Sequence, residues 1–233
     1  MKLLLWRHGR TTWNDAGRFQ GHADPPLDST GEAQVAAVAP LIRAMNPDLV
    51  VSSDLRRCRA TAAGLDLPFR TDARLREIDL GGWSGLTGAE AAVRFPEEDQ
   101  AWRAGQDVRR GGGETYREVA ERAGELLDEI RAEGLAGRPD GLVVFVLHGG
   151  TARSLIGHVL GFPSELWWHF GPLSNCRWSL LRLAEGGYRL TEHNAGPLLA
   201  GKVGLAGSGL SEPLLPSQGA PVGSDTEPVH LPR

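Results

Sequence analysis

Apolar residues along the chain gather in short continuous runs that alternate with stretches of helical spacing. Three runs predict buried strands, at Lys2–Arg7, Leu49–Ser52 and Leu142–Leu147. The third run is continuous rather than alternating, which is typical of a central strand in a parallel sheet that is covered on both faces. The helical stretches predict helices over Thr30–Ala44, Leu55–Ala63, Thr115 to about Ala132, and Thr151–Leu160. Strands that alternate with helices predict an α/β fold, doubly wound, with a mostly parallel sheet and helices on both faces.

Other segments carry local signals of helix starts and turns. Thr115 and Glu118 have the spacing of a capping box, so we expect Thr115 to open its helix. Two further runs, Trp178–Leu183 and Tyr188–His193, flank Glu185-Gly186-Gly187. This arrangement predicts a hairpin that closes the fold.

The chain is predicted to form one domain over residues 1–198. Between residues 81 and 113 the pattern weakens into short helical pieces, which we interpret as a lid-like insertion over the site. Beyond Leu199 the residues show no apolar period, so we expect 199–233 to be a disordered C-terminal tail. Four tryptophans are expected to pack in the core or lid rather than to form a stacking platform: Trp83, Trp102, Trp167 and Trp168.

Composition excludes several classes of partner. The formal net charge of -4 gives no support to binding of nucleic acid, whose phosphates demand a basic face. Only Lys2 and Lys202 are lysines, so the positive charge is nearly all arginine, which can grip a phosphate with a planar fork. Cys58 and Cys176 lack the spacing of metal ligands. No apolar stretch approaches membrane-spanning length, and we expect a cytoplasmic protein that does not bind membranes.

Polar clusters directly follow the three predicted strands. They are Arg7-His8-Gly9, Ser53-Asp54-Leu55-Arg56-Arg57 and His148-Gly149-Gly150. In an open parallel sheet, ligands bind outside the carboxyl ends of the strands. If the three strands are neighbours, two arginines and two histidines therefore meet in one crevice. Gly149 and Gly150 would let the backbone approach a ligand closely, and the following helix would offer free N–H groups to an anion. The pattern predicts a phosphate site that needs neither a metal nor another cofactor.

Taken one at a time, these residues also have ordinary structural explanations. The arginines of 56–59 could form a solvated helix face, His148 could be a structural histidine, and Glu77 could be a surface carboxylate. Their joint order and their position at strand ends favour a site.

Seven motifs support this interpretation. In chain order they are Arg7–Asn14, Gln20-Gly21, Pro26–Gln34, Ser52–Ala62, Leu75–Thr87, Gly112–Thr115 and His148–Arg153. Together they resemble the histidine phosphatase, or phosphoglycerate mutase-like, superfamily. The resemblance covers about residues 2–198 and implies a phosphoglycerate mutase-like fold.

The resemblance implies a role for each matching residue. His8 matches the nucleophile that becomes phosphohistidine, and Glu77 matches the proton donor and acceptor. The groups that bind the transferring phosphoryl oxygens are matched by Arg7, Arg57 and His148. Positions that line the phosphate pocket are matched by Asn14 and Gly21. A nucleophilic histidine must be neutral, and nearby arginines disfavour its protonated form. We expect Glu77 to start protonated and later to activate water.

The residues after Glu77 bear on the type of reaction. The cofactor-dependent mutases carry Glu-Arg-His-Tyr-Gly at this point, whereas this chain has Glu77-Ile78-Asp79-Leu80-Gly81. The resemblance therefore favours the phosphatase branch, similar to glucosyl-3-phosphoglycerate phosphatases and broad-specificity phosphatases. We expect a phosphomonoesterase that acts on a small phosphorylated metabolite, such as a sugar phosphate or a phosphoglycerate-like ester.

Two alternatives stay open, a cofactor-dependent phosphoglycerate mutase and a catalytically inactive module that binds a phospho-ligand. The expected partner is a small-molecule phosphate ester, and a homodimer is possible. Arg103, Arg109 and Arg110 could reach a carboxylate or a second phosphate of the substrate, or could lie on a solvated face.

Overall fold

Six strands form one sheet in the computed structural model, which describes residues 1–134 and 141–197. The strands lie in the order β3-β2-β4-β1-β5-β6. The pairs β3–β2, β2–β4 and β4–β1 are parallel, whereas β5 runs antiparallel to both of its neighbours. The bounds are β1 Lys2–Arg7, β2 Leu49–Ser52, β3 Arg70–Thr71, β4 Leu142–Leu147, β5 Trp178–Ala184 and β6 Gly187–Ala195.

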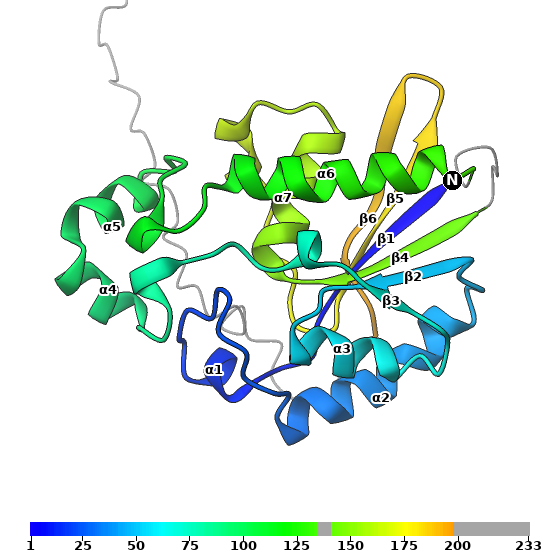
Figure 1. Cartoon of the computed structure of the whole chain (residues 1–233), viewed down its shortest axis with the longest axis horizontal. Coiled ribbons are helices and arrows are strands. Elements are labelled where there is room, and N and C mark those ends of the chain that lie inside the picture. The colour runs from blue at the N-terminus through cyan, green and yellow to red at the C-terminus, as the bar shows by residue number, and fades with distance from the viewer. Residues whose placement is uncertain (135–140, 198–233) are drawn as a thin grey trace, which may run out of the picture.

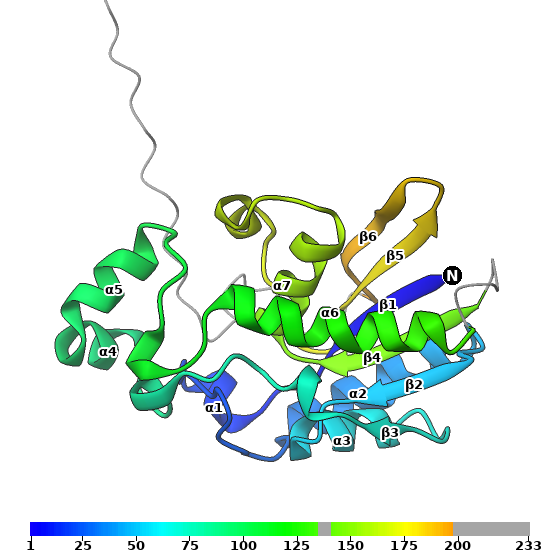
Figure 2. The same ribbon diagram turned by 45° about the horizontal axis from the view of Figure 1, so that its top comes forward.

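Helices cover both faces of this sheet. In Figure 1, α6 and α7 lie on one side of the strands, and α2 and α3 lie on the other. Figures 1 and 2 both show α4 and α5 beyond one end of the sheet, away from the strands. The α-helices are α1 Thr12–Asp15, α2 Ser29–Arg43, α3 Arg56–Ala63, α4 Gly88–Arg94, α5 Pro96–Arg103, α6 Tyr116–Ala132 and α7 Gly149–Val159. The 3-10 turns are η1 Ala73–Leu75, η2 Gly81–Trp83, η3 Arg110–Gly112 and η5 Ser164–His169.

Successive residues of the central strands enter two different cores. Leu3 and Leu5 of β1 pack in the core beneath α6 and α7, whereas Leu4 and Trp6 pack in the core beneath α2 and α3. All six residues of β4 are buried, since this strand lies in the middle of the sheet and is covered on both faces. The predicted fold class, doubly wound α/β with a mostly parallel sheet, is confirmed.

A third apolar cluster lies apart from these two cores, and we refer to it as the aromatic cluster. Its buried aromatic members are Phe19, Trp83, Trp102, Tyr116 and Trp167. Trp168 packs against it, so the expectation that the four tryptophans pack in the core or lid is confirmed. The cluster holds η2, α4, α5 and η3 together, which make up the segment interpreted as a lid.

Most predicted elements are present, with shifted ends. Thr115 caps α6 in a capping box with Glu118, as expected. The helix predicted from Thr151 begins two residues earlier, at Gly149. The pattern did not predict α1, β3 or η5, which are short. The predicted tail, 199–233, lies outside the described residues. In the part of the chain that the structure describes, no helix combines the length and apolar character needed to cross a membrane.

Candidate active site

A cavity of about 60 Å³ lies at the carboxyl ends of β1, β2 and β4. These three strands are neighbours in the sheet, which confirms the predicted convergence of their polar clusters. Seven of the eight predicted site residues line it: Arg7, His8, Asn14, Gly21, Arg57, Glu77 and Gly149.

His8 follows β1 directly and is 2% exposed. Its backbone N–H donates to the carbonyl oxygen of Leu147 at 3.0 Å, which ties the end of β1 to the end of β4. The ring Nδ1 lies 2.7 Å from the carbonyl oxygen of Gly9. A carbonyl only accepts, so Nδ1 carries the proton and Nε2 keeps its lone pair. Burial and the charges of Arg57 and Arg7 hold the pKa of His8 well below its usual 6.5, so the ring is neutral.

Arg57 lies in the first turn of α3 and is fully buried. Its Nη1 and Nη2 donate to the carbonyl oxygens of Ala23 and Gly21, at 2.7 and 2.9 Å. Its Nε donates to Nδ1 of His148 at 3.2 Å. The guanidinium is therefore fixed by the loop after α1 and by the residue after β4. Burial lowers the pKa of Arg57.

His148 is the predicted site residue that does not line the cavity. It is the N-cap residue of α7, makes no capping hydrogen bond with its side chain, and is completely buried. Because Nδ1 accepts from Arg57, Nε2 carries the proton and donates to Oγ of Ser53 at 3.0 Å. Burial and then Arg57 hold the pKa of His148 well below 6.5. In this structure His148 orients Arg57 and lies edge-on to His8, with ring centroids 5.1 Å apart. Its expected contact with phosphoryl oxygens stays a prediction.

Arg7 is the last residue of β1 and lies beside His8. Its Nη1 donates to the carbonyl oxygen of Leu173, whereas its buried Nε has no hydrogen-bond partner among the described residues. Burial lowers the pKa of Arg7 to about 10, so the side chain stays charged at neutral pH. Arg7 and Arg57 thus place two fixed cations at the same wall of the cavity as His8.

The Glu77 carboxylate lies against the first turn of α7. Its Oε1 accepts from the backbone N–H of Ile78 at 2.9 Å and of Thr151 at 3.0 Å, and Oε2 accepts from the N–H of Gly150 at 3.1 Å. A Cβ added at Gly150 would meet Oε1 at 2.6 Å. The expectation that this helix start offers its N–H groups to a bound anion is wrong for Gly150 and Thr151, whose N–H groups Glu77 takes, and stays a prediction for Gly149.

Asn14 and Asn175 form a polar contact behind His8. Oδ1 of Asn14 accepts from the N–H and Oγ1 of Thr11, at 3.1 and 3.0 Å, and from Nδ2 of Asn175 at 3.3 Å. With Oδ1 occupied by three donors, the Nδ2 group of Asn14 is the one left for a ligand in the cavity. Asn175 also donates to the carbonyl oxygen of His8 at 3.0 Å. No sequence pattern predicts this contact of Asn175, which lies in the connection between η5 and β5.

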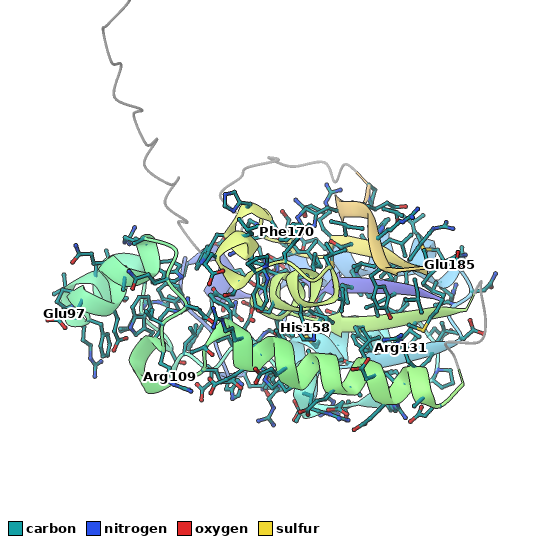
Figure 3. The ribbon with its side chains drawn as sticks, turned by 90° about the horizontal axis from the view of Figure 1, so that it is seen from above. Glu97, Arg109, Arg131, His158, Phe170 and Glu185 are labelled. Atoms are coloured by element: carbon teal, nitrogen blue, oxygen red, sulfur yellow. The ribbon has the colours of Figure 1, made fainter. Side chains whose placement is uncertain are left out.

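The three arginines proposed to reach a second group of the substrate differ in position. Arg103 pairs with Asp99 at 2.6 Å, and Arg109 pairs with Glu118 on the surface. Figure 3 shows Arg109 on the outside of the molecule. Arg110 is 1% exposed and lines the cavity. Of the three arginines, Arg110 is the one in position to meet a bound molecule.

Positive charge in the cavity comes from arginine side chains. Among residues 1–134 and 141–197, no group of three or more histidine, cysteine, aspartate or glutamate side chains is arranged to hold a metal ion. Both cysteines are buried and free, and burial raises the pKa of Cys176 to about 12. The arrangement suits the binding of a phosphate beside a neutral histidine.

Comparison with known proteins agrees with this chemistry. The family model described as "Histidine phosphatase superfamily (branch 1)" matches residues 3–196. A glucosyl-3-phosphoglycerate phosphatase of Mycobacterium tuberculosis (strain CDC 1551 / Oshkosh) is 38% identical over 188 residues, which cover 77% of this chain and 84% of that protein. Phosphoserine phosphatase 1 of Hydrogenobacter thermophilus is 31% identical over 190 residues, 79% of this chain and 88% of that protein.

A solved structure of a mycobacterial glucosyl-3-phosphoglycerate phosphatase, in complex with VO3, is similar over most of its length. The TM-score is 0.79 and the sequence identity is 37%. The similarity covers 84% of this chain and 99% of that chain.

Proposed function

The chain belongs to the histidine phosphatase superfamily (branch 1) and is a phosphoric monoester hydrolase, and we propose that it works through a phosphoryl group carried on Nε2 of His8. The observation that supports this most is the state of the His8 ring. It is buried, neutral and protonated at Nδ1, and it lies in a cavity that Arg7 and Arg57 also line. A neutral imidazole with a free lone pair is the form in which histidine acts as a nucleophile.

The reaction takes place in two steps at phosphorus. In the first, the lone pair of Nε2 forms a bond to phosphorus while the bond from phosphorus to the ester oxygen breaks. The leaving alkoxide takes a proton from the carboxyl group of Glu77. In the second step the Glu77 carboxylate takes a proton from water, the water oxygen attacks phosphorus, and the bond to Nε2 breaks. Inorganic phosphate leaves and His8 is neutral again.

Arg7 and Arg57 act on the charge of the phosphoryl group. Negative charge in phosphoryl transfer is spread over three equatorial oxygens, so fixed cations supply most of the stabilisation. Three hydrogen bonds fix the guanidinium of Arg57 without a ligand. The side chain therefore does not have to change position as charge develops during the reaction. In the first step Glu77 must act as the acid that gives a proton to the leaving oxygen.

The substrate is a small phosphorylated metabolite. Substrates of the glucosyl-3-phosphoglycerate and phosphoserine type, taken from the names of the relatives, are the first to test. We further propose that residues 81–113 act as a lid. A cytoplasmic location and a homodimer stay predictions.

Trapping the phosphorylated protein tests this function. Wild-type protein and His8→Ala are mixed with p-nitrophenyl phosphate and quenched at alkaline pH, where phosphohistidine survives. We expect phosphate on His8 in the wild-type protein, and neither label nor turnover in the variant, whose circular dichroism should match that of the wild type. Normal turnover by His8→Ala would overturn the proposal.

A further inference from the structure

Arg110 is a buried cation on the lining of the cavity, and part of its hydrogen-bonding capacity is unused among the described residues. The residue is 1% exposed, and its Nε and Nη2 are shut off from solvent without a hydrogen-bond partner in the described residues. Burying a charge without acceptors is unfavourable by several kcal/mol. The side chain nevertheless lines the cavity that contains His8. A partner for Arg110 can therefore arrive through this cavity.

Three aromatic rings hold the guanidinium of Arg110 in place. Its Cζ lies 5.0 Å from the ring centroid of Tyr116, 5.3 Å from that of Trp102 and 5.8 Å from that of Trp83. Ring faces attract a cation, but they leave the N–H donors in the plane of the guanidinium without acceptors. The rings thus orient the group and keep water away from it, while its hydrogen-bonding capacity stays available.

The backbone at Arg110 is equally fixed. The N–H of Gly111 donates to Oε2 of Glu98 at 2.6 Å, and the same oxygen accepts from Nε1 of Trp83 at 2.9 Å. Gly111 has φ of 59°, and a Cβ there would lie 2.4 Å from the backbone nitrogen of Gly82. The turn that carries Arg110 is therefore packed directly on η2, a few residues after Glu77. Such a fixed position is what recognition of a substrate group requires.

The charges that line the cavity indicate what Arg110 binds. Among the described residues that line the cavity, Arg7, Arg57 and Arg110 are buried cations, and Glu77 is the only acidic residue. Arg18 at the same cavity is already paired with Glu90 at 3.0 Å. With Glu77 carrying the proton that it donates, a phosphate monoester dianion neutralises two of the three positive charges. One positive charge is left for a second, singly charged group.

We propose that Arg110 binds a carboxylate of the substrate, and that the preferred substrates are phosphate monoesters of short hydroxy acids. The proposal rests on the phosphatase function proposed above and specifies its substrate. A planar guanidinium matches a planar carboxylate with two parallel hydrogen bonds. A second phosphate would bring two negative charges to a place where the structure supplies one cation among aromatic side chains. Arg110 lines the same cavity as His8, so the carboxylate and the phosphate must belong to one small molecule.

The test compares esters that differ in the carboxylate alone. One pair is 3-phosphoglycerate and glycerol 3-phosphate, and the other is O-phosphoserine and O-phosphoethanolamine. In the wild-type protein we expect kcat/KM to be roughly ten- to a hundredfold higher for the carboxylate member, since a charged hydrogen-bonded pair supplies that much. Arg110→Gln should remove this preference by lowering kcat/KM for the carboxylate members more than for the carboxylate-free esters. Arg109→Gln, whose side chain pairs on the surface, is the matched control and should keep the preference.

Several outcomes would overturn the proposal. Equal use of both members by the wild-type protein would do so, as would a preference that survives in Arg110→Gln. An equal loss for both members of a pair would mean that Arg110 only supports the aromatic cluster. If Arg110→Gln does not fold, inhibition constants of the four esters against wild-type hydrolysis of p-nitrophenyl phosphate decide the question, and equal constants within each pair would reject it. Failure of the phosphatase function itself would appear differently, as absence of p-nitrophenyl phosphate hydrolysis in every protein.

Discussion

The backbone N–H of Gly150 donates to one oxygen of the Glu77 carboxylate, and a Cβ at Gly150 would lie 2.6 Å from the other oxygen. Real Cβ atoms do not approach an oxygen so closely, so the glycine and the glutamate depend on each other. The position of the Glu77 side chain thus requires a glycine at residue 150. This contact can be tested with a single methyl group.

Gly150→Ala should displace the Glu77 carboxylate and slow the reactions that need its proton. We expect kcat/KM for an alkyl phosphate such as glycerol 3-phosphate to fall by about a hundredfold, because kcat/KM reports on departure of the leaving group and general acid catalysis supplies roughly 10²–10⁴. The kcat/KM for p-nitrophenyl phosphate should fall much less, since its leaving group departs without a proton. Gly171→Ala is the control, because nothing lies within 4 Å of an added Cβ there. An equal loss with both substrates would show that the methyl group disturbs phosphate binding instead.

Stability of the fold should decrease as the pH is lowered below about 6.5. The pKa values of His8 and His148 lie well below 6.5 in the folded chain, mainly because both rings are buried. In the unfolded chain both rings take up protons near that pH, so the unfolded state binds more protons. The free energy of unfolding should then fall by about 1.4 kcal/mol per pH unit for each histidine.

Urea denaturation at about pH 7.5, 6 and 5 measures this effect. The variant His148→Gln removes one of the two groups and should show about half of the wild-type slope between pH 6.5 and 5. A wild-type free energy of unfolding that does not change over this range would contradict the neutral state of both rings.

Hydrolysis should exceed transfer of the phosphoryl group between hydroxyls. Ile78 and Leu80 line the cavity next to Glu77, and their buried apolar side chains cannot donate hydrogen bonds to the far end of a substrate. A mutase must hold its intermediate in two orientations and keep water away from phosphohistidine. With 3-phosphoglycerate and 2,3-bisphosphoglycerate supplied together, we expect phosphate release to be faster than formation of 2-phosphoglycerate. Faster isomerisation would favour the mutase alternative.

The sequence predicts which residues lie at the strand ends better than it predicts the hydrogen bonds that fix those residues. Apolar runs predict strands at Lys2–Arg7 and Leu142–Leu147. The polar residues after these runs are therefore expected at the ends of the strands. Contacts between distant segments leave no such pattern. Asn175 reaches His8 across 167 positions of the chain, and Arg57 reaches His148 across 91.

The same limit explains the role of Gly150. The glycine pair 149–150 predicts that the backbone approaches a ligand closely. Glycine, however, permits any group to approach the backbone, whether ligand or side chain. Only the structure identifies the approaching group as the side chain of Glu77, 73 positions away. The sequence pattern also does not distinguish the arginines, since Arg109 and Arg110 are adjacent residues of the same type, yet Arg109 is exposed and Arg110 is buried.

The aromatic cluster is separate from the two cores that support the sheet, and this separation has an evolutionary consequence. His8, Arg7 and Arg57 depend on the ends of β1 and on α3, whereas Arg110 depends on Trp83, Trp102 and Tyr116. Substitutions of Trp83, Trp102 or Tyr116 can therefore change what Arg110 recognises while His8, Arg7 and Arg57 keep their supports. A gene duplicate of this fold can diverge in what it recognises while it inherits its chemistry unchanged.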